Sequence, residues 1–397
     1  MSLQSTPSAN RIHIGFFGAR NAGKSSTVNA FTGQELAVVS DTKGTTTDPV
    51  SKAMELLPLG PVMIIDTPGF DDVGTLGEMR VKKTLQILRK TDIAVLVADA
   101  TMPLGACEQE LIALFRGRDI PYIIAYNKCD LLKNRTVSAA HEIYISAKTG
   151  EGIHALKEMC ASLHTVQAQK PIVSDLLACG DTVILVVPID ESAPKGRLIL
   201  PQVQTIRDIL DGGAQALVVK PGELQQAFAS LKHPPKMVIT DSQVFDAVSR
   251  IVPPEVPLTS FSILMARYKG FLQTAFQGVK ALDTLQNGDT VLIAEGCTHH
   301  RQCNDIGTVK IPRWLKQYSA KDIQIETCSG TEFPEDVSAY KLVIHCGGCM
   351  LTEREVKYRM NTCIQAGVPF INYGVLIAFM TGILERSVEM FQGNDEQ

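Results

Sequence analysis

The sequence predicts an α/β protein built from three consecutive segments of alternating strands and helices. Short apolar runs alternate with helical patterns along most of the chain, and many of the runs end in loops that contain glycine, aspartate or cysteine. Ligands of open parallel sheets bind beyond the carboxyl ends of the strands, so these loops are the candidate sites. The length of 397 residues suits two or three domains. We expect domains over residues 1–168, 172–268 and 269–397.

The composition is ordinary for a globular chain, with 45% hydrophobic residues, 20% charged residues and a net charge of −4. No basic footprint is evident, so nucleic acid is not an expected partner. The N-terminal residues show no charged-then-apolar signal pattern, and the late apolar run at 374–384 is too short to span a bilayer. We therefore expect a cytoplasmic protein with no membrane partner. Ten cysteines in such a chain favour buried, reactive or metal-bound thiols over a disulfide framework.

The most specific motif is the stretch 18–26, GARNAGKSS, which fits the phosphate-binding pattern G-x-x-x-x-G-K-[ST]. An apolar run at 12–17 precedes it as a predicted strand, and 26–31 can open a helix, which is the context that the motif requires. The glycines let backbone N–H groups surround a phosphate, the lysine adds charge, and the serine hydroxyl can bind magnesium. The alternative, a glycine-rich turn that binds nothing, fits this context poorly. The residues predicted to contact the nucleotide are Gly18, Asn21, Ala22, Gly23, Lys24, Ser25 and Ser26.

More polar loops follow the apolar runs of this first segment, at 66–69 (DTPG), 127–130 (NKCD) and 146–148 (SAK). Together with 18–26 and the threonine-rich loop 44–48, they occur in the order of the five signatures of P-loop GTPases. The segment therefore resembles that family, and we expect residues 1–168 to form a P-loop GTPase domain. The buried strands predicted before the loops lie at 63–65, 93–98 and 122–126.

The resemblance implies a role for each matching residue. Asp66 would help to hold magnesium through water, Gly69 would sense the terminal phosphate of GTP, and Thr46 would bind magnesium from the first switch. Asp130 would select guanine, because its carboxylate accepts two hydrogen bonds that adenine cannot supply. The cofactors implied are GTP or GDP and Mg²⁺, and the activity is hydrolysis of GTP to GDP and phosphate. The other base-binding residues implied by the match are Asn127, Lys128, Ser146, Ala147 and Lys148.

Two positions in this domain bear on the rate of hydrolysis. Phe70 stands where Ras-like proteins carry the glutamine that orients the attacking water, which indicates slow intrinsic hydrolysis. Asn21 matches an asparagine of a potassium-activated, dimerising branch of the family, in which its side-chain oxygen binds K⁺. Such an ion would add positive charge to the transition state. The alternative is that Asn21 is only a tolerated polar loop residue. The resemblance thus makes Asn21, Lys24, Thr46 and Gly69 the expected catalytic residues.

The middle segment, 172–268, follows a candidate linker at 167–171 and again reads as α/β. Strands are predicted at 183–187, 216–219 and 237–239, with a helix at 203–210. No paired acids, histidine cluster or phosphate loop marks a site here, so packing or dimerisation is its plainest use.

The third segment, 269–397, contains a second constellation of ligand-capable groups. A predicted strand at 290–294 ends at EGCTHH, and another at 341–344 ends at HCGGC. If these strands are neighbours in a parallel sheet, Cys297, Cys346 and Cys349 converge in one crevice. A metal bound to these thiolates is favoured over buried free cysteines or a redox C-x-x-C pair, and spacing alone does not choose between zinc and iron. The histidines beside the crevice are His299, His300 and His345, and the cysteines read as mostly core are Cys107, Cys129, Cys160, Cys179, Cys303, Cys328 and Cys363.

The combination of these three segments resembles the HydF family of iron–iron hydrogenase maturation GTPases, and the resemblance spans the whole chain. It implies a homodimeric scaffold and carrier that holds a 4Fe-4S cluster on Cys297, Cys346 and Cys349. His299, His300 and His345 are the candidates for the fourth ligand. The family receives a two-iron precursor from radical-SAM maturases and passes it to apo iron–iron hydrogenase. The radical-SAM motif C-x-x-x-C-x-x-C does not occur in this sequence, so the chain is expected to be a partner of those enzymes.

Two other classes of function stay open at this point. One is a ribosome- or tRNA-associated GTPase with a structural zinc tail, which strongly salt-dependent binding of RNA would support. The other is a GTP-regulated dithiol or metal-trafficking protein, which a disulfide between Cys346 and Cys349 without bound metal would support.

Overall fold

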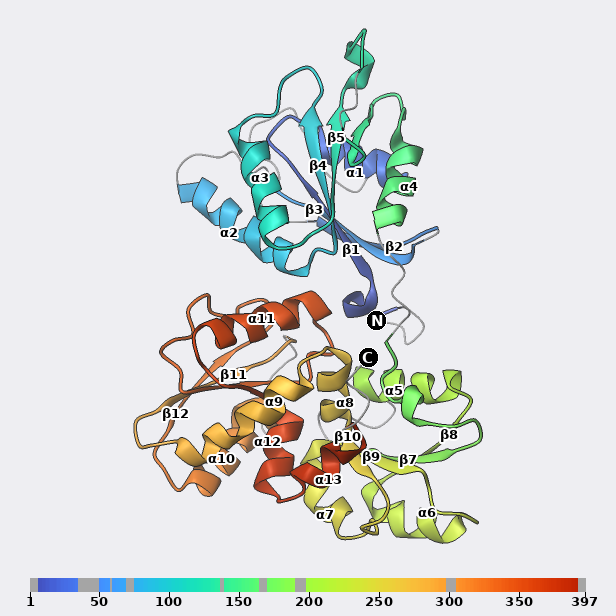
Figure 1. The fold of residues 1–397 in the computed structure, drawn as a ribbon, viewed down its shortest axis with the longest axis vertical. Helices are drawn as coiled ribbons and strands as arrows, with labels where there is room; N and C mark the ends of the chain where they lie inside the picture. The colour runs from blue at the N-terminus through green and yellow to red at the C-terminus, as the bar shows by residue number, and fades with distance from the viewer. Residues whose placement is uncertain are drawn as a thin grey trace. The chain divides into compact units, whose positions relative to one another are not determined.

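The computed structural model describes residues 6–34, 50–57, 59–68, 75–135, 139–163, 170–189, 198–297 and 305–391, with the backbone alone for 50, 75–80 and 82. The chain divides into two compact units, Met1–Gln169 and Lys170–Gln397. The first has one largely parallel sheet and the second has two parallel sheets, with helices packed on their faces (Figure 1). The predicted α/β class is confirmed.

The first unit is built on a six-stranded sheet in the order β2-β3-β1-β4-β5-β6. All neighbouring strands are parallel except β2, which runs antiparallel to β3. The predicted strands at 12–17, 63–65, 93–98 and 122–126 all lie in this sheet. Its strands are β1 (Ile12–Phe17), β2 (Val50–Leu56), β3 (Gly60–Asp66), β4 (Ile93–Asp99), β5 (Tyr122–Asn127) and β6 (Glu142–Tyr144).

Helices cover both faces of this sheet because the central strands are apolar on both sides. Phe16 of β1 packs against Phe31 of α1 on one face, and its neighbour Phe17 packs against Phe115 of α3 on the other. Figure 1 shows α1 and α4 on the first face and α2 and α3 on the second. The helices are α1 (Lys24–Thr32), α2 (Thr75–Lys90), α3 (Ala106–Gly117) and α4 (Ile153–Leu163).

The second unit begins with a four-stranded parallel sheet in the order β10-β9-β7-β8. The strands and the helix predicted in the middle segment are present here. The elements are β7 (Thr182–Val186), α5 (Leu200–Asp211), β8 (Gln215–Val219), α6 (Leu224–Ser230), β9 (Met237–Thr240), α7 (Phe245–Ser249), β10 (Leu258–Ser260) and α8 (Phe261–Tyr268).

A second four-stranded parallel sheet follows, in the order β12-β11-β13-β14. α10 and α11 lie on opposite sides of it (Figure 1), as right-handed connections that leave in opposite directions require. The elements are α9 (Leu272–Gly278), β11 (Thr290–Ala294), α10 (Ile311–Ser319), β12 (Gln324–Cys328), β13 (Leu342–His345), α11 (Glu353–Gln365), β14 (Phe370–Asn372), α12 (Tyr373–Met380) and α13 (Leu384–Val388).

The two sheets of the second unit share one continuous apolar core. The connection runs through α8 and α12: the side-chain amide of Asn372 donates to the carbonyl of Ser262, and the backbone N–H of Gly374 donates to the Ser262 hydroxyl. The apolar run at 374–384 forms α12 and leads into α13, both packed in this core. Within the described ranges, no helix combines the length and apolar character needed to cross a bilayer.

Candidate functional site

The loop between β1 and α1 is shaped by two glycines at points of close approach. Gly18 has φ +149°, and a Cβ there would lie 2.2 Å from the carbonyl oxygen of Val97. Gly23 has φ +84°, precedes α1, and would place a Cβ 2.2 Å from Nδ2 of Asn127. Asn21 between them is exposed and also has a positive φ, of 60°. The loop therefore keeps its backbone open at the N-terminus of α1, where N–H groups can bind an anion.

A hydroxyl and a carboxylate meet beside this loop. Lys24 is only 8% exposed, and the Oγ of Ser25 donates to Oδ2 of Asp66, at the end of β3, over 2.8 Å. The other carboxylate oxygen of Asp66 is buried and has no hydrogen-bond partner among the described residues. Burial raises the pKa of Asp66, although the charge of Lys24 and the bond from Ser25 oppose the rise. A buried oxygen without a partner beside a serine hydroxyl is a donor set that fits Mg²⁺.

The loop after β5 is tied to the phosphate loop before any ligand is considered. Nδ2 of Asn127 donates to the carbonyl of Ala22 at 2.9 Å, and Oδ1 of Asn127 accepts the N–H of Ala147 at 3.0 Å. One side chain thus joins three of the predicted nucleotide loops. Asp130 lies exposed next to them, where a guanine base could reach its carboxylate, and Lys148 is also exposed.

Lys128 has a partner that the sequence analysis missed. Its Nζ lies 2.5 Å from Oδ2 of Asp99 at the end of β4, and Asp99 also accepts the N–H and the hydroxyl of Thr101. Burial raises the pKa of Asp99, but the hydrogen bonds from Lys128 and Thr101 together lower it by more than burial raises it. The pKa of Asp99 therefore lies below its ordinary value. The position of Asp99 directly after the predicted strand at 93–98 was a signal that could have suggested this role.

The structure thus brings the loops around 18–26, 66, 127–130 and 146–148 to one edge of the sheet. Two of the predicted residues, Thr46 and Gly69, lie outside the described residues, as does Phe70.

The two cysteine motifs of the second unit also meet at one sheet edge. β11 and β13 are adjacent and parallel, and Ala294 is in register with His345. The sulfur of Cys346 accepts the N–H of Gly296 at 3.1 Å and the N–H of Gly348 at 3.4 Å. The condition that the sequence analysis set, two neighbouring parallel strands, is therefore met.

The thiols differ in their surroundings. Burial raises the pKa of Cys346, while the N–H groups of Gly348 and Gly296 counteract it. Burial, and next the neighbouring Cys346, raises the pKa of Cys349 to about 12. Cys297 is half-buried. N–H groups aimed at a sulfur suit a metal-bound thiolate, and thiolates are ligands of both iron–sulfur clusters and zinc.

The described residues do not gather a complete metal site. Within the part of the chain that the structure describes, no three His, Cys, Asp or Glu side chains converge closely enough to hold a metal ion. Two of the predicted ligands, His299 and His300, fall outside that part, as does Cys303.

His345 is described, and its ring is fully engaged. Nδ1 lies 2.6 Å from the carbonyl oxygen of Cys346, and Nε2 lies 3.3 Å from Nη1 of Arg359. Burial, and then the charge of Arg359, lowers the pKa of His345 to about 3, so its imidazole is neutral. Arg359, which no sequence motif marks, is fully buried on α11.

The sheet order, the glycine-shaped loop and the Ser25–Asp66 pair define the first unit as a P-loop GTPase domain. Residues 13–128 match the family model described as "50S ribosome-binding GTPase". Residues 172–270 match the "Hydrogen maturase F dimerization domain" and residues 273–390 the "Hydrogen maturase F tetramerization domain". The chain belongs to the HydF-type hydrogenase maturation GTPases.

Other relatives resemble the GTPase part. The tRNA modification GTPase MnmE of Legionella pneumophila (strain Corby) is 38% identical over 145 residues, 36% of this chain and 32% of the relative. GTPase Der of Wolinella succinogenes is 31% identical over 172 residues, 39% of this chain and 36% of the relative. The chain thus spans about a third of the length of these curated relatives. A crystal structure of an Aquifex aeolicus Era variant bound to GDP·AlF4⁻ aligns with 17% identity and a TM-score of 0.36, covering 52% of this chain and 93% of that one.

Proposed function

We propose that this protein is a GTP-hydrolysing scaffold and carrier for the active-site cluster of iron–iron hydrogenase. In this proposal, the first unit binds GTP, and the second holds a 4Fe-4S cluster and a transient two-iron precursor, its cargo. The main support is the coincidence of two features: a braced set of GTPase loops, and C-x-H and H-C-x-x-C motifs at the ends of the adjacent strands β11 and β13.

In the nucleotide site, we propose a role for each of the predicted residues. The backbone of 18–26 and Lys24 hold the phosphates, and Ser25 and Asp66, with Thr46, hold Mg²⁺. Asp130 selects guanine, and Asn127 positions its loop against Ala22. Gly69 senses the terminal phosphate. When bound, Mg²⁺ and a K⁺ ion on Asn21 supply positive charge where the transition state becomes more negative.

In the cluster site, Cys297, Cys346 and Cys349 are the proposed thiolate ligands, and the fourth iron takes a weaker ligand, for which His299, His300 and His345 are the candidates. Gly296 and Gly348 donate N–H groups to the sulfur of Cys346, which stabilises negative charge on that ligand. The cluster supplies an iron with an exchangeable position, to which a second iron unit could attach.

The proposed partners follow from the family. They are apo iron–iron hydrogenase, the radical-SAM maturases that make the precursor, and a second copy of this chain, with a cytoplasmic location. The matches to a dimerization and a tetramerization domain support assembly into oligomers, and we propose the domain boundaries 1–168, 172–268 and 269–397. A tRNA-directed function gains no support from the MnmE likeness, because that likeness covers only 36% of the chain.

The experiment that tests this proposal is metal and sulfide analysis of anaerobically prepared protein. We expect iron and sulfide in equal amounts, about four of each per chain. Replacing Cys297, Cys346 or Cys349 by serine should abolish the cluster and hydrogenase activation and spare GTP hydrolysis, because the nucleotide loops lie in the other unit. Stoichiometric zinc without sulfide, or a disulfide between Cys346 and Cys349 in place of metal, would overturn the carrier function.

A further inference from the structure

The imidazole of His345 lies in closed surroundings at the end of β13. It is fully buried, and the rings of Phe271 and Phe370 contact it with centroid distances of 6.1 and 5.4 Å. A Cβ on Gly348 would lie 3.6 Å from Cε1 of the ring. The imidazole therefore cannot turn toward a ligand without repacking both phenylalanines and the C-x-x-C turn.

The partners of the two ring nitrogens determine where the hydrogen is. The carbonyl oxygen of Cys346, 2.6 Å from Nδ1, can only accept, and the guanidinium of Arg359, 3.3 Å from Nε2, can only donate. Nδ1 therefore carries the hydrogen, and the lone pair of Nε2 points at Arg359. A neutral imidazole binds a metal through its one lone pair. In His345, a buried cation already occupies that lone pair.

Arg359 is held from several sides, so this contact is not incidental. Its Nε donates to Oε1 of Glu355 at 3.1 Å, its Nη2 donates to the carbonyl of Gly330, and its guanidinium lies 5.2 Å from the centroid of Phe333. Its side chain is 0% exposed and that of Glu355 is 6% exposed. Removing water from an ion pair is costly and is tolerated only when the remaining hydrogen bonds are satisfied. These contacts hold the guanidinium of Arg359 beside Nε2 of His345.

We propose that Glu355, Arg359 and His345 form a positioning relay for the C-x-x-C turn, and that His345 is not the fourth ligand of the cluster. The relay ends on the carbonyl of Cys346, and the same turn directs the N–H of Gly348 at the Cys346 sulfur. Arg359 and His345 thus act through the backbone of a ligand. This inference rests on the proposed cluster and leaves its fourth position to another group.

The first test is pulsed EPR of the reduced cluster in wild-type protein and in His345→Gln. Glutamine retains one donor and one acceptor, so it can partly replace both hydrogen bonds of the imidazole. We expect full iron and sulfide content and the same nitrogen couplings in both proteins. A histidine nitrogen coupling that disappears in His345→Gln, while the cluster remains, would overturn the inference and leave the carrier function intact. Zinc without sulfide in the wild-type protein would overturn both.

The second test asks whether Arg359 and His345 act as one unit. We expect Arg359→Met and His345→Phe each to speed cluster loss to a chelator about tenfold, and the double variant to match the single ones. A roughly hundredfold acceleration in the double variant would mean independent effects and would contradict the relay. If Arg359→Met does not fold, the variant Glu355→Gln/Arg359→Gln removes both buried charges together. This variant then takes the place of Arg359→Met in the double-mutant comparison with His345→Phe.

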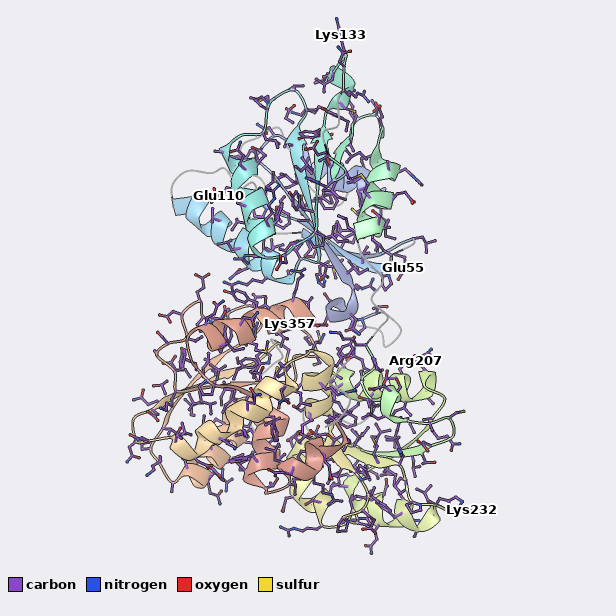
Figure 2. All side chains as sticks on the ribbon, viewed as in Figure 1. Glu55, Glu110, Lys133, Arg207, Lys232 and Lys357 are labelled. Carbon is purple, nitrogen blue, oxygen red and sulfur yellow. The ribbon has the colours of Figure 1, made fainter. Side chains whose placement is uncertain are left out.

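The matched control is Lys357→Met. Lys357, labelled in Figure 2, lies on the same helix as Arg359. It forms an ion pair with Glu353, and 45% of its side chain is exposed. The Lys357→Met variant removes a positive charge two positions from Arg359 but outside the relay. The rate at which this variant loses its cluster should therefore equal the wild-type rate. An equal acceleration in this control would attribute the effect to helix charge and overturn the relay.

Discussion

The nucleotide site and the cysteine site lie at the same kind of place, the carboxyl edge of a parallel sheet, but they are prepared to different degrees. In the first unit, Asn127 alone bonds to Ala22 and Ala147 and so joins three loops. In the second unit, Cys346 receives two N–H groups, yet the described residues do not bring three metal ligands together. Among the described residues, the nucleotide loops are already joined to one another, whereas the cysteine-site ligands are not gathered around one metal position.

The difference follows from what each ligand can contribute. A nucleotide is bound by many weak contacts, so loops that are already ordered avoid the entropy cost of arranging them. Metal–thiolate bonds are strong enough to organise their own ligands, and metal binding is commonly coupled to local folding. The comparison therefore predicts that nucleotide affinity is sensitive to small changes in loop geometry, whereas cluster assembly is sensitive to loss of a ligand and less so to loss of a supporting contact.

The largest effect on the preformed site should come from Asp130→Asn. Its exposed carboxylate is the group proposed to accept two hydrogen bonds from guanine. Charge-assisted hydrogen bonds are worth about 1.5–3 kcal/mol each, so GTP affinity should fall about 100-fold or more, and the preference should move toward xanthine nucleotides. Equilibrium binding of labelled GTP and XTP measures both effects. Unchanged GTP affinity would show that Asp130 does not recognise the base. As a control, the iron content of the variant should equal that of the wild type, because the proposed cluster lies in the other unit.

Gly23→Ala tests the role of Asn127 in joining the nucleotide loops through its bonds to Ala22 and Ala147. A Cβ at Gly23 would lie 2.2 Å from Nδ2 of Asn127, and φ is +84°. We expect at least about a tenfold loss of GTP affinity, because Asn127 must move and its bonds to Ala22 and Ala147 weaken. Gly33→Ala is the matched control: Gly33 has φ +67° but nothing within 4 Å of the added Cβ. Both variants carry backbone strain of roughly 1–2 kcal/mol, so equal losses of affinity would refute the bracing role.

Much of this arrangement was predictable because motifs and apolar runs carry it locally. The loops at 18–26 and 127–130 follow β1 and β5 as expected. The adjacency of β11 and β13 was only a condition in the sequence analysis, since strand order depends on long-range pairing that periodicity does not encode.

Other features could not be predicted. Arg359 and Lys357 are both charged residues of one helical segment, and only tertiary packing buries the first and exposes the second. The strands β2 and β12 lie at the edges of their sheets, where many of their side chains are exposed or only partly buried. Polar residues are tolerated at such positions, so the sequences of these strands show only a weak apolar pattern. The apolar core that runs through both sheets of the second unit was likewise not visible in a sequence that reads as two separate α/β segments.

The next prediction concerns Asn21 and the rate of GTP hydrolysis in the nucleotide site. It is exposed in the phosphate loop with φ +60°, so its side chain is available to an ion. We expect GTP hydrolysis to be slow and about tenfold faster in potassium than in sodium, since one fixed cation stabilises developing negative charge. Asn21→Ala should remove the difference and leave GTP binding within about twofold. Phosphate release measured in matched potassium and sodium buffers checks this, and equal wild-type rates in the two salts would exclude the ion.

The smallest effect should come from a supporting contact of the incomplete site, in Gly348→Ala. Gly348 has φ +66°, a Cβ there would lie 3.0 Å from Cγ2 of Val356, and its N–H points at the Cys346 sulfur over 3.4 Å. Strain in the turn should weaken that bond. N–H groups stabilise the more negative, reduced cluster, so the midpoint potential should become more negative by on the order of tens of millivolts, with full iron and sulfide content. Gly367→Ala, at φ +68° with nothing within 4 Å, imposes similar backbone strain at the end of α11 and should leave the potential unchanged. Loss of the cluster in Gly348→Ala would mean that the cysteine site depends on its framework as strongly as the nucleotide site does, and the contrast between the two sites would fail.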